Sequence, residues 1–206
     1  MKHIFKQGKK NLPVLLLLHG TGGTENDLLP LAELIAPENS ILSVRGNVSE
    51  NGMPRFFKRL AEGVFDEEDL IKRTHELKAF IDESSQKYDF DRHNVIAIGY
   101  SNGANIAGSL LFHDANSLRG AVLHHPMVPL RNLKLPSLAS KPIFIGAGKN
   151  DPICSPEETN ELQELFTGAG AKVTVHWENA GHQLTRSEAE KAAEWYQKNF
   201  QGKKKN

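Results

Sequence analysis

Short apolar runs alternate with longer amphipathic segments along the whole chain. Leu15–Leu18 is entirely apolar and Val173–Trp177 alternates apolar with polar positions, and both patterns are typical of strands. The pattern predicts strands at residues 2–6, 13–18, 40–45, 94–98, 119–124, 142–147 and 172–177, and helices at 24–36, 66–87, 102–113, 156–169 and 186–200. This alternation predicts an α/β fold with a doubly wound, mostly parallel sheet whose first strand is an antiparallel edge.

The length of 206 residues suits a single domain, residues 1–206. Only a loop fits between the strand that ends near His124 and the strand that starts near Pro142, so we expect a minimal form without a cap domain. Residues 201–206 are locally basic and are predicted to form a flexible tail.

The charge balance argues against two classes of partner. There are 25 basic and 25 acidic residues, so no strong field attracts nucleic acid or an anionic membrane.

The apolar run Leu12–Leu18 lacks a signal-peptide cleavage site and leads into a glycine-rich loop, so we interpret it as a strand rather than a leader. Cys154 is the lone cysteine, which favours a reducing cytoplasm and a packing role for this side chain.

A strand, a sharp turn and a helix meet at Gly99–Gly103, with the sequence GYSNG. Glycines two positions before and after Ser101 allow the close backbone approach that a nucleophile elbow requires. A glycine-flanked surface turn would give the same pattern, but the flanking strand and helix favour the elbow. Ser101 is therefore the candidate nucleophile.

A serine nucleophile needs a histidine base and a carboxylate, and in this fold they follow in the order Ser, Asp, His. Asp151 follows the predicted strand at 142–147 and precedes a helix start with Ser155 as N-cap and Glu158 as its capping-box partner. His182 follows the strand at 172–177 and precedes a second capping box, 185–188. Loops that leave parallel strands at their carboxyl ends share one edge of the sheet, so we expect Ser101, Asp151 and His182 to converge. Glu178 is the alternative acid.

The loop His19–Gly23 follows the buried strand at 13–18 and supplies a second catalytic element. Acyl transfer needs two backbone N–H donors for the oxyanion, one of them from the residue after the nucleophile and one from an early strand-to-helix loop. The amides of Asn102 and Thr21 fit these positions, and Thr24 is placed to cap the helix that follows. A phosphate cradle is excluded because no lysine follows in P-loop register.

An irregular loop over residues 46–65 is predicted to shape the substrate pocket. It offers an apolar wall and one cation, supplied by Met53, Arg55, Phe56 and Phe57, although packing beneath the loop is the alternative for one of the phenylalanines. His125 ends the strand at 119–124 together with His124, and we interpret the pair as pocket lining or packing. No third ligand stands at metal spacing, so neither a metal nor another cofactor is expected.

Four segments together resemble the phospholipase/carboxylesterase branch of the α/β-hydrolases, which includes acyl-protein thioesterases: His19–Gly23, Gly99–Gly103, Gly148–Pro152 and Gly181–His182. Three others look most similar to small bacterial carboxylesterases associated with hydroquinone resistance: Arg45–Asn47, Gly52–Phe57 and His125–Pro129. The resemblance implies Ser101, Asp151 and His182 as the triad, with Thr21 and Asn102 as oxyanion amides. Acyl-protein thioesterases typically carry glutamine where Asn102 stands, which argues against transferring their lipidated-protein substrates.

The expected activity is cofactor-independent hydrolysis of a small carboxylic ester. With only loops over the catalytic edge, the cleft should suit short acyl chains or an aromatic ring. Alternatives are a thioesterase or lysophospholipase-type deacylase, and a ligand sensor that keeps the triad without turnover. A third is a dienelactone-type hydrolase, against which Ser101 argues because that type usually carries cysteine at the elbow. The sequence leaves the oligomeric state open, with a homodimer as one alternative.

Overall fold

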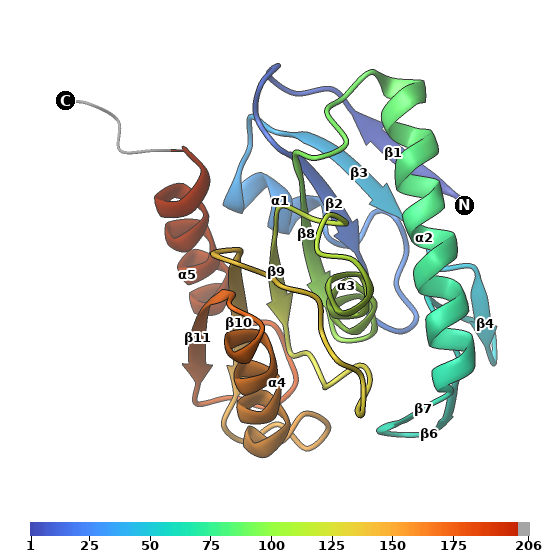
Figure 1. Cartoon of the computed structure of the whole chain (residues 1–206), viewed down its shortest axis with the longest axis vertical. Helices are drawn as coiled ribbons and strands as arrows, with labels where there is room; N and C mark the ends of the chain where they lie inside the picture. The colour runs from blue at the N-terminus through green and yellow to red at the C-terminus, as the bar shows by residue number, and fades with distance from the viewer. Residues whose placement is uncertain (202–206) are drawn as a thin grey trace.

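The computed structural model describes residues 1–201 and is built on a seven-stranded sheet (Figure 1). In spatial order the strands are β1 (His3–Lys6), β3 (Ser40–Val44), β2 (Val14–Leu18), β8 (Val95–Tyr100), β9 (Gly120–His124), β10 (Pro142–Gly148) and β11 (Lys172–Glu178). β1 pairs antiparallel with β3, and the remaining neighbours in this order pair in parallel. The predicted doubly wound, mostly parallel sheet with an antiparallel first strand is confirmed.

Helices cover both faces of the sheet (Figure 1). The helices are α1 (Leu29–Ile35), α2 (Glu67–Tyr88), α3 (Asn102–His113), α4 (Pro156–Gly168) and α5 (Arg186–Tyr196), and a π-helical turn, η1 (Gln197–Gln201), continues α5. In β2, Leu16 and Leu18 pack with α2, α3 and α4, whereas Leu15 and Leu17 pack with α1 and α5. Burial on both sides explains why this strand is apolar at every position.

Two regions differ from the prediction. The first helix begins at Leu29 rather than near residue 24, because Thr24 closes a local turn instead of capping it: its hydroxyl accepts from the Asn26 amide at 3.2 Å and donates to Asp27 Oδ1 at 2.9 Å. The loop 46–65 contains two small antiparallel ribbons, β4 (Val48–Glu50) with β5 (Met53–Arg55) and β6 (Arg59–Ala61) with β7 (Val64–Phe65). The tail predicted for 201–206 lies outside the described residues except for Gln201.

The carboxyl ends of β2, β8, β10 and β11 carry the loops that hold the candidate catalytic residues. Residues 125–141, between β9 and β10, form a loop without helix or strand, in agreement with the expectation of no cap domain. No helix within residues 1–201 has the length and apolar character needed to cross a membrane.

Candidate active site

Ser101 lies at the turn between β8 and α3 in a strained backbone conformation, with φ 50° and ψ −114°. Its amide donates to the carbonyl of His124 at 2.9 Å, which fixes the turn against β9. A Cβ at Gly99 would lie 2.7 Å from Ala104 Cα, and one at Gly103 would lie 1.9 Å from the Leu18 carbonyl oxygen. Both glycines are therefore required by the tight packing of the turn, as a nucleophile elbow demands.

The structure brings Ser101, His182 and Asp151 into one hydrogen-bonded chain. His182 Nε2 lies 2.8 Å from Ser101 Oγ, and His182 Nδ1 donates to Asp151 Oδ2 at 2.8 Å. Asp151 is almost fully buried. Glu178, the alternative acid, is paired instead with His176 at 2.8 Å.

Backbone donors keep Asp151 ionised despite its burial. Burial alone would raise the pKa of this carboxyl, but the amides of Cys154 and Ile153, at 2.9 and 2.8 Å from Oδ1, together with His182, lower it below its ordinary value. The Asp151 carboxylate can therefore orient the imidazole of His182 through Nδ1. Tyr100 supports the same geometry, because its hydroxyl donates to the backbone carbonyl of His182 at 2.8 Å.

The two candidate oxyanion amides come from the start of α3 and from the loop after β2. Asn102 is the first residue of α3, where a helix N–H has no intrahelical acceptor. Its side chain is held by the Phe56 amide, which donates to Asn102 Oδ1 at 2.7 Å. Thr21 is held by Arg55, whose Nη1 donates to Thr21 Oγ1 at 2.6 Å. Two side-chain anchors thus fix the backbone whose amides would bind an oxyanion.

His19 is a supporting residue that the sequence analysis passed over. Its Nδ1 donates to the carbonyl of Gly20 at 2.6 Å, and its Nε2 accepts from the amide of Gly46 at 3.0 Å. Burial lowers the pKa of His19, which suits a neutral ring with one donor and one acceptor. His19 therefore ties the Thr21 loop to the loop after β3; its position directly before the glycines was the available signal.

A cavity of about 360 Å³ opens beside the triad. Met53 and Arg55 line it, as predicted. Its other lining residues are Thr21, Arg59, Glu62, Gly63, Phe65, Tyr100, Ser101, Asn102, Asn105, Met127, Ile153, Cys154 and His182. The Arg55 guanidinium is buried and already donates to Thr21 and to the Phe57 carbonyl, which leaves it little freedom to follow a substrate.

Phe56 and Phe57 require a correction, because they do not line this cavity. Their side chains are 1% and 0% exposed and pack in the core with α2 and α3. Burying a phenyl ring in a packed core stabilises the fold more than leaving it at an open cleft, and here both rings are buried. Phe65 of β7 lines the cavity instead and packs edge to face against Phe57, with ring centroids 5.0 Å apart.

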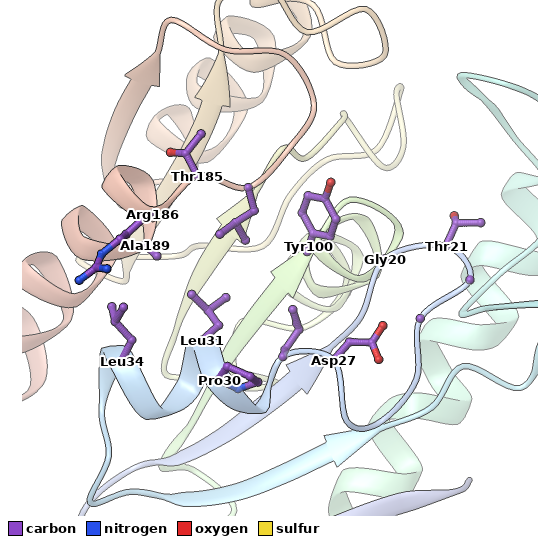
Figure 2. A pocket seen from close by; sticks show the side chains of 14 residues that line it. Gly20, Thr21, Asp27, Pro30, Leu31, Leu34, Tyr100, Thr185, Arg186 and Ala189 are labelled. Atoms are coloured by element: carbon purple, nitrogen blue, oxygen red, sulfur yellow. The ribbon is translucent and has the colours of Figure 1, made fainter.

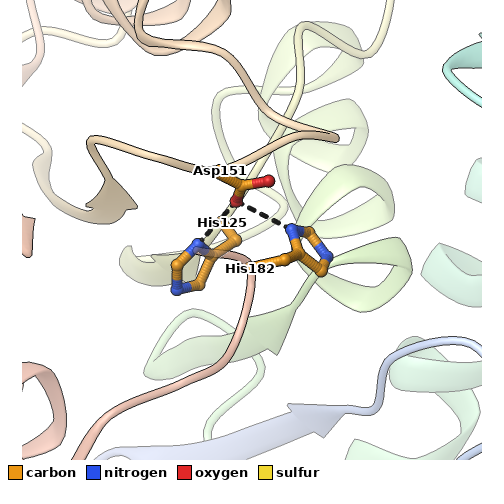
Figure 3. A group of neighbouring side chains, drawn as sticks. All are labelled: His125, Asp151 and His182. Carbon is orange, nitrogen blue, oxygen red and sulfur yellow. Dashed lines mark hydrogen bonds and ion pairs between the residues drawn. The ribbon is translucent and has the colours of Figure 1, made fainter. Parts of the chain in front are cut away.

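His125 also requires a correction: it lies behind the triad, fully buried, rather than in the pocket. Its backbone is left-handed, with φ 52°. Nδ1 donates to Asp151 Oδ2 at 2.9 Å and Nε2 donates to Glu188 Oε2 at 3.0 Å (Figure 3 shows the first contact). Burial alone would lower the pKa of His125, but the hydrogen bonds and charges of Glu188 and Asp151 outweigh it and raise the pKa.

Glu188, the last residue of the capping box predicted at 185–188, has a partner that the capping box does not predict. Its amide donates to Thr185 Oγ1 at 3.1 Å, which is the predicted cap, but its carboxylate turns into the core to bind His125 and His124 Nδ1. Burial alone would raise the pKa of this group, yet the two histidines lower it to about 2. Gly146 makes room for it, since a Cβ there would lie 1.9 Å from Glu188 Oε1.

The donor atoms of His125, Asp151 and His182 lie within 4.8 Å of one another, a spacing that could hold a metal ion. Both histidine Nδ1 atoms are already directed at Asp151 Oδ2 (Figure 3). A metal would have to displace both hydrogen bonds. Cys154 adds no ligand character: its thiol is buried, burial raises its pKa, and Sγ lies 3.1 Å from the His125 carbonyl oxygen.

The family model for the dienelactone hydrolase family matches residues 48–203. The chain belongs to this family. It is 60% identical to the putative hydrolase MhqD of Bacillus subtilis (strain 168), over 95% of this chain and 98% of that protein. The crystal structure of the Bacillus cereus carboxylesterase is similar with a TM-score of 0.96 and 67% identity, over 97% of this chain and 95% of that one. The structure of YahD with malic acid follows at TM-score 0.92 and 34% identity, over 96% and 98%.

These relatives identify the protein as a carboxylesterase of the α/β-hydrolase fold. The resemblance drawn from the motifs therefore leads to the correct fold and enzyme class. The family also has the name of the third alternative, the dienelactone-type hydrolase, although Ser101 stands at the elbow where that type usually carries cysteine.

Proposed function

We propose that this carboxylesterase cleaves small carboxylic esters through an acyl-enzyme, with Ser101 as nucleophile. The observation that supports this is the hydrogen-bonded chain from Ser101 Oγ through His182 to Asp151, at 2.8 Å in both steps. Nucleophile, base and orienting acid within this reach are the arrangement that acyl transfer by serine requires.

In the proposed reaction His182 Nε2 takes the hydroxyl proton as Ser101 Oγ attacks the ester carbonyl. The amides of Thr21 and Asn102 donate to the oxyanion of the tetrahedral intermediate. His182 then gives its proton to the departing alcohol, and Ser101 keeps the acyl group. A water molecule, deprotonated by His182, attacks the acyl-enzyme and releases the acid. Asp151 stabilises the imidazolium that forms in each half.

The cavity of about 360 Å³ suits a small ester, and Arg55 and Met53 are proposed to contact it. Thioester hydrolysis uses the same groups and is the second candidate. A lone cysteine supports action in a reducing compartment such as the cytoplasm, with the chain as one domain.

Labelling with a fluorophosphonate, followed by mapping of the adduct, tests the nucleophile directly. Ser101 should carry the adduct. In parallel, kcat/KM is measured for p-nitrophenyl acetate, butyrate and hexanoate and for the matching acyl thioesters. Multiple turnover of these substrates supports the enzyme, whereas stoichiometric binding without turnover would support a ligand sensor on the same fold.

A further inference from the structure

A second hollow, which we call the α1/α5 groove, is lined in part by Tyr100, which also lines the catalytic cavity (Figure 2 shows the groove). Its volume is about 650 Å³, within the range of small-molecule sites. It is lined by the loop after β2, by α1 and by the start of α5: Gly20, Thr21, Gly22, Gly23, Asp27, Leu28, Pro30, Leu31, Leu34, Tyr100, Leu184, Thr185, Arg186 and Ala189. The groove cannot be predicted from local sequence patterns because its walls come from separate helices.

The α1/α5 groove adjoins the catalytic cavity, because Thr21 and Tyr100 line both. Tyr100 directly precedes Ser101, and Thr21 carries a candidate oxyanion amide. The loop packs so closely here that a Cβ at Gly20 would lie 2.9 Å from the Tyr100 ring. The groove therefore begins next to the residues that would hold the reacting carbonyl.

The walls of the groove select for an uncharged, apolar group. Leu28, Leu31 and Ala189 are core residues that turn one side to it, and Leu34 remains 39% exposed. The charged side chains that line it are already paired: Asp27 accepts from Thr24 at 2.9 Å, and Arg186 donates to Glu190 at 2.8 Å. An apolar hollow beside a reactive centre indicates a ligand site rather than incidental exposure.

We propose that the α1/α5 groove binds the apolar arm of the ester, an alkyl or aryl group joined to the reacting carbonyl. This inference rests on the proposed function. Figure 2 shows Leu34 and Tyr100 on opposite sides of the groove with Leu31 between them. Because α1 spans seven residues, or about 10 Å, an arm must be of medium length to reach Leu34. A short arm ends near Tyr100.

The test compares Leu34→Gln with the wild type on two substrate series. One series varies the acyl arm from acetyl to decanoyl on p-nitrophenol, and the other varies the alcohol arm from ethyl to octyl on acetate. In the wild type, kcat/KM should rise about fourfold for each methylene that the groove buries. Leu34→Gln should lower kcat/KM about fivefold for the long members of one series and leave its acetyl or ethyl member unchanged. The series that responds assigns the arm.

Leu133→Gln is the matched control, since Leu133 is 38% exposed in the loop between β9 and β10 and does not line the groove. It should leave both series unchanged. Equal response of short and long substrates to Leu34→Gln, or no response in either series, would overturn the proposal, as would a change confined to the oligomeric state. Binding of 2-decanone, a ketone with an alkyl arm and no leaving group, is measured on the same proteins by calorimetry. Weaker binding of 2-decanone to Leu34→Gln, but not to Leu133→Gln, supports a binding site in the groove even if the protein does not turn over esters. The groove proposal and the proposed function can therefore fail independently.

Discussion

Two histidines share one oxygen of Asp151 but differ in the partner of their second ring nitrogen and in their exposure to solvent. His182 and His125 donate through Nδ1 to Asp151 Oδ2, at 2.8 and 2.9 Å (Figure 3). The second nitrogen of His182 faces the hydroxyl of Ser101, whereas the second nitrogen of His125 faces the carboxylate of Glu188. The His182 side chain is 19% exposed and the His125 side chain is fully buried.

The partner at the second nitrogen decides what each ring can do. A hydroxyl can donate to a neutral imidazole, so His182 can act as a base. A carboxylate only accepts when it is ionised, so His125, between Asp151 and Glu188, must donate from both nitrogens and is an imidazolium. The pKa is raised for His125 and lowered for the carboxyls of Asp151 and Glu188, which agrees with an imidazolium between two carboxylates. One ring is therefore placed to move a proton and the other to hold one.

The largest expected effect comes from removing the Ser101 hydroxyl, which contacts His182 but not His125. Ser101→Ala should lower kcat/KM by about 10⁴-fold to 10⁶-fold, because the residues of a triad act as a unit. Steady-state hydrolysis of p-nitrophenyl butyrate measures it. Ser140→Ala is the control, since Ser140 is another serine with a left-handed backbone, φ 60°, in an exposed turn. Near-wild-type hydrolysis by Ser101→Ala would refute the proposed function.

Removing the charge that both histidines share should have the next largest effect. Asp151→Asn should lower kcat about 10³-fold to 10⁴-fold at neutral pH, because an amide favours the wrong tautomer of His182. Asp89→Asn is the control, as Asp89 ends α2 in a left-handed conformation that asparagine tolerates. Unchanged kcat in Asp151→Asn would show that a different acid orients His182.

The sequence was sufficient where chemistry is local. The turn at Ser101 needs glycines on both sides, and the capping residues Ser155 and Thr185 act within their own helices, so spacing alone identified them. The two capping-box acids show where this reasoning fails. Glu158 and Glu188 stand at the correct spacing, yet their carboxylates bind the Val128 amide and the His125 ring, 30 and 63 residues away. Local spacing carries no information on these partners.

The same limit explains the errors in the pocket. The loop 46–65 was correctly placed beside the cleft, but which of its side chains face inward depends on the two ribbons and on the core beneath them. Phe56 and Phe57 turn into that core, while Met53 and Phe65 remain at the cavity. Helix 24–36 was predicted too long because a turn at Thr24 uses the same residue types as a helix cap.

The free energy of unfolding of Glu188→Gln tests the role of the negative charge that keeps His125 protonated. Glu188 has its pKa lowered to about 2 in the folded protein, so its stabilisation is present above the ordinary pKa of 4.5 and is lost as the pH falls toward 2. At pH 6 the variant should lose about 3 kcal/mol of unfolding free energy in urea denaturation, and this difference should narrow as the pH falls. Glu190→Gln removes one member of the exposed ion pair with Arg186 on the same helix and should leave the unfolding free energy almost unchanged. A difference between Glu188→Gln and wild type that stays constant down to pH 3 would contradict this account.

The smallest effect expected is a shift of the pH profile when the buried cation is removed. His125→Asn keeps a residue that tolerates the left-handed backbone, but it takes away the positive charge beside Asp151. The rings of His125 and His182 lie 5.3 Å apart, a distance at which two unit charges interact by about 3 kcal/mol at an effective dielectric of 20. Solvent at the exposed side of His182 reduces this to about 1 kcal/mol, which corresponds to a shift of about 0.7 pH unit.

The sign of this shift follows from the charge that is lost. Without the cation, the Asp151 carboxylate favours a protonated His182 more strongly, so the acid limb of the kcat/KM profile should move to higher pH. A loss of folded protein that is equal at every pH does not move the profile, and circular dichroism across the same pH range checks that condition. His176→Asn, which breaks a histidine–carboxylate pair on β11 with no contact to Asp151, should leave the limb in place. An acid limb that stays fixed or moves to lower pH in His125→Asn would mean that His125 is not a cation in the working enzyme.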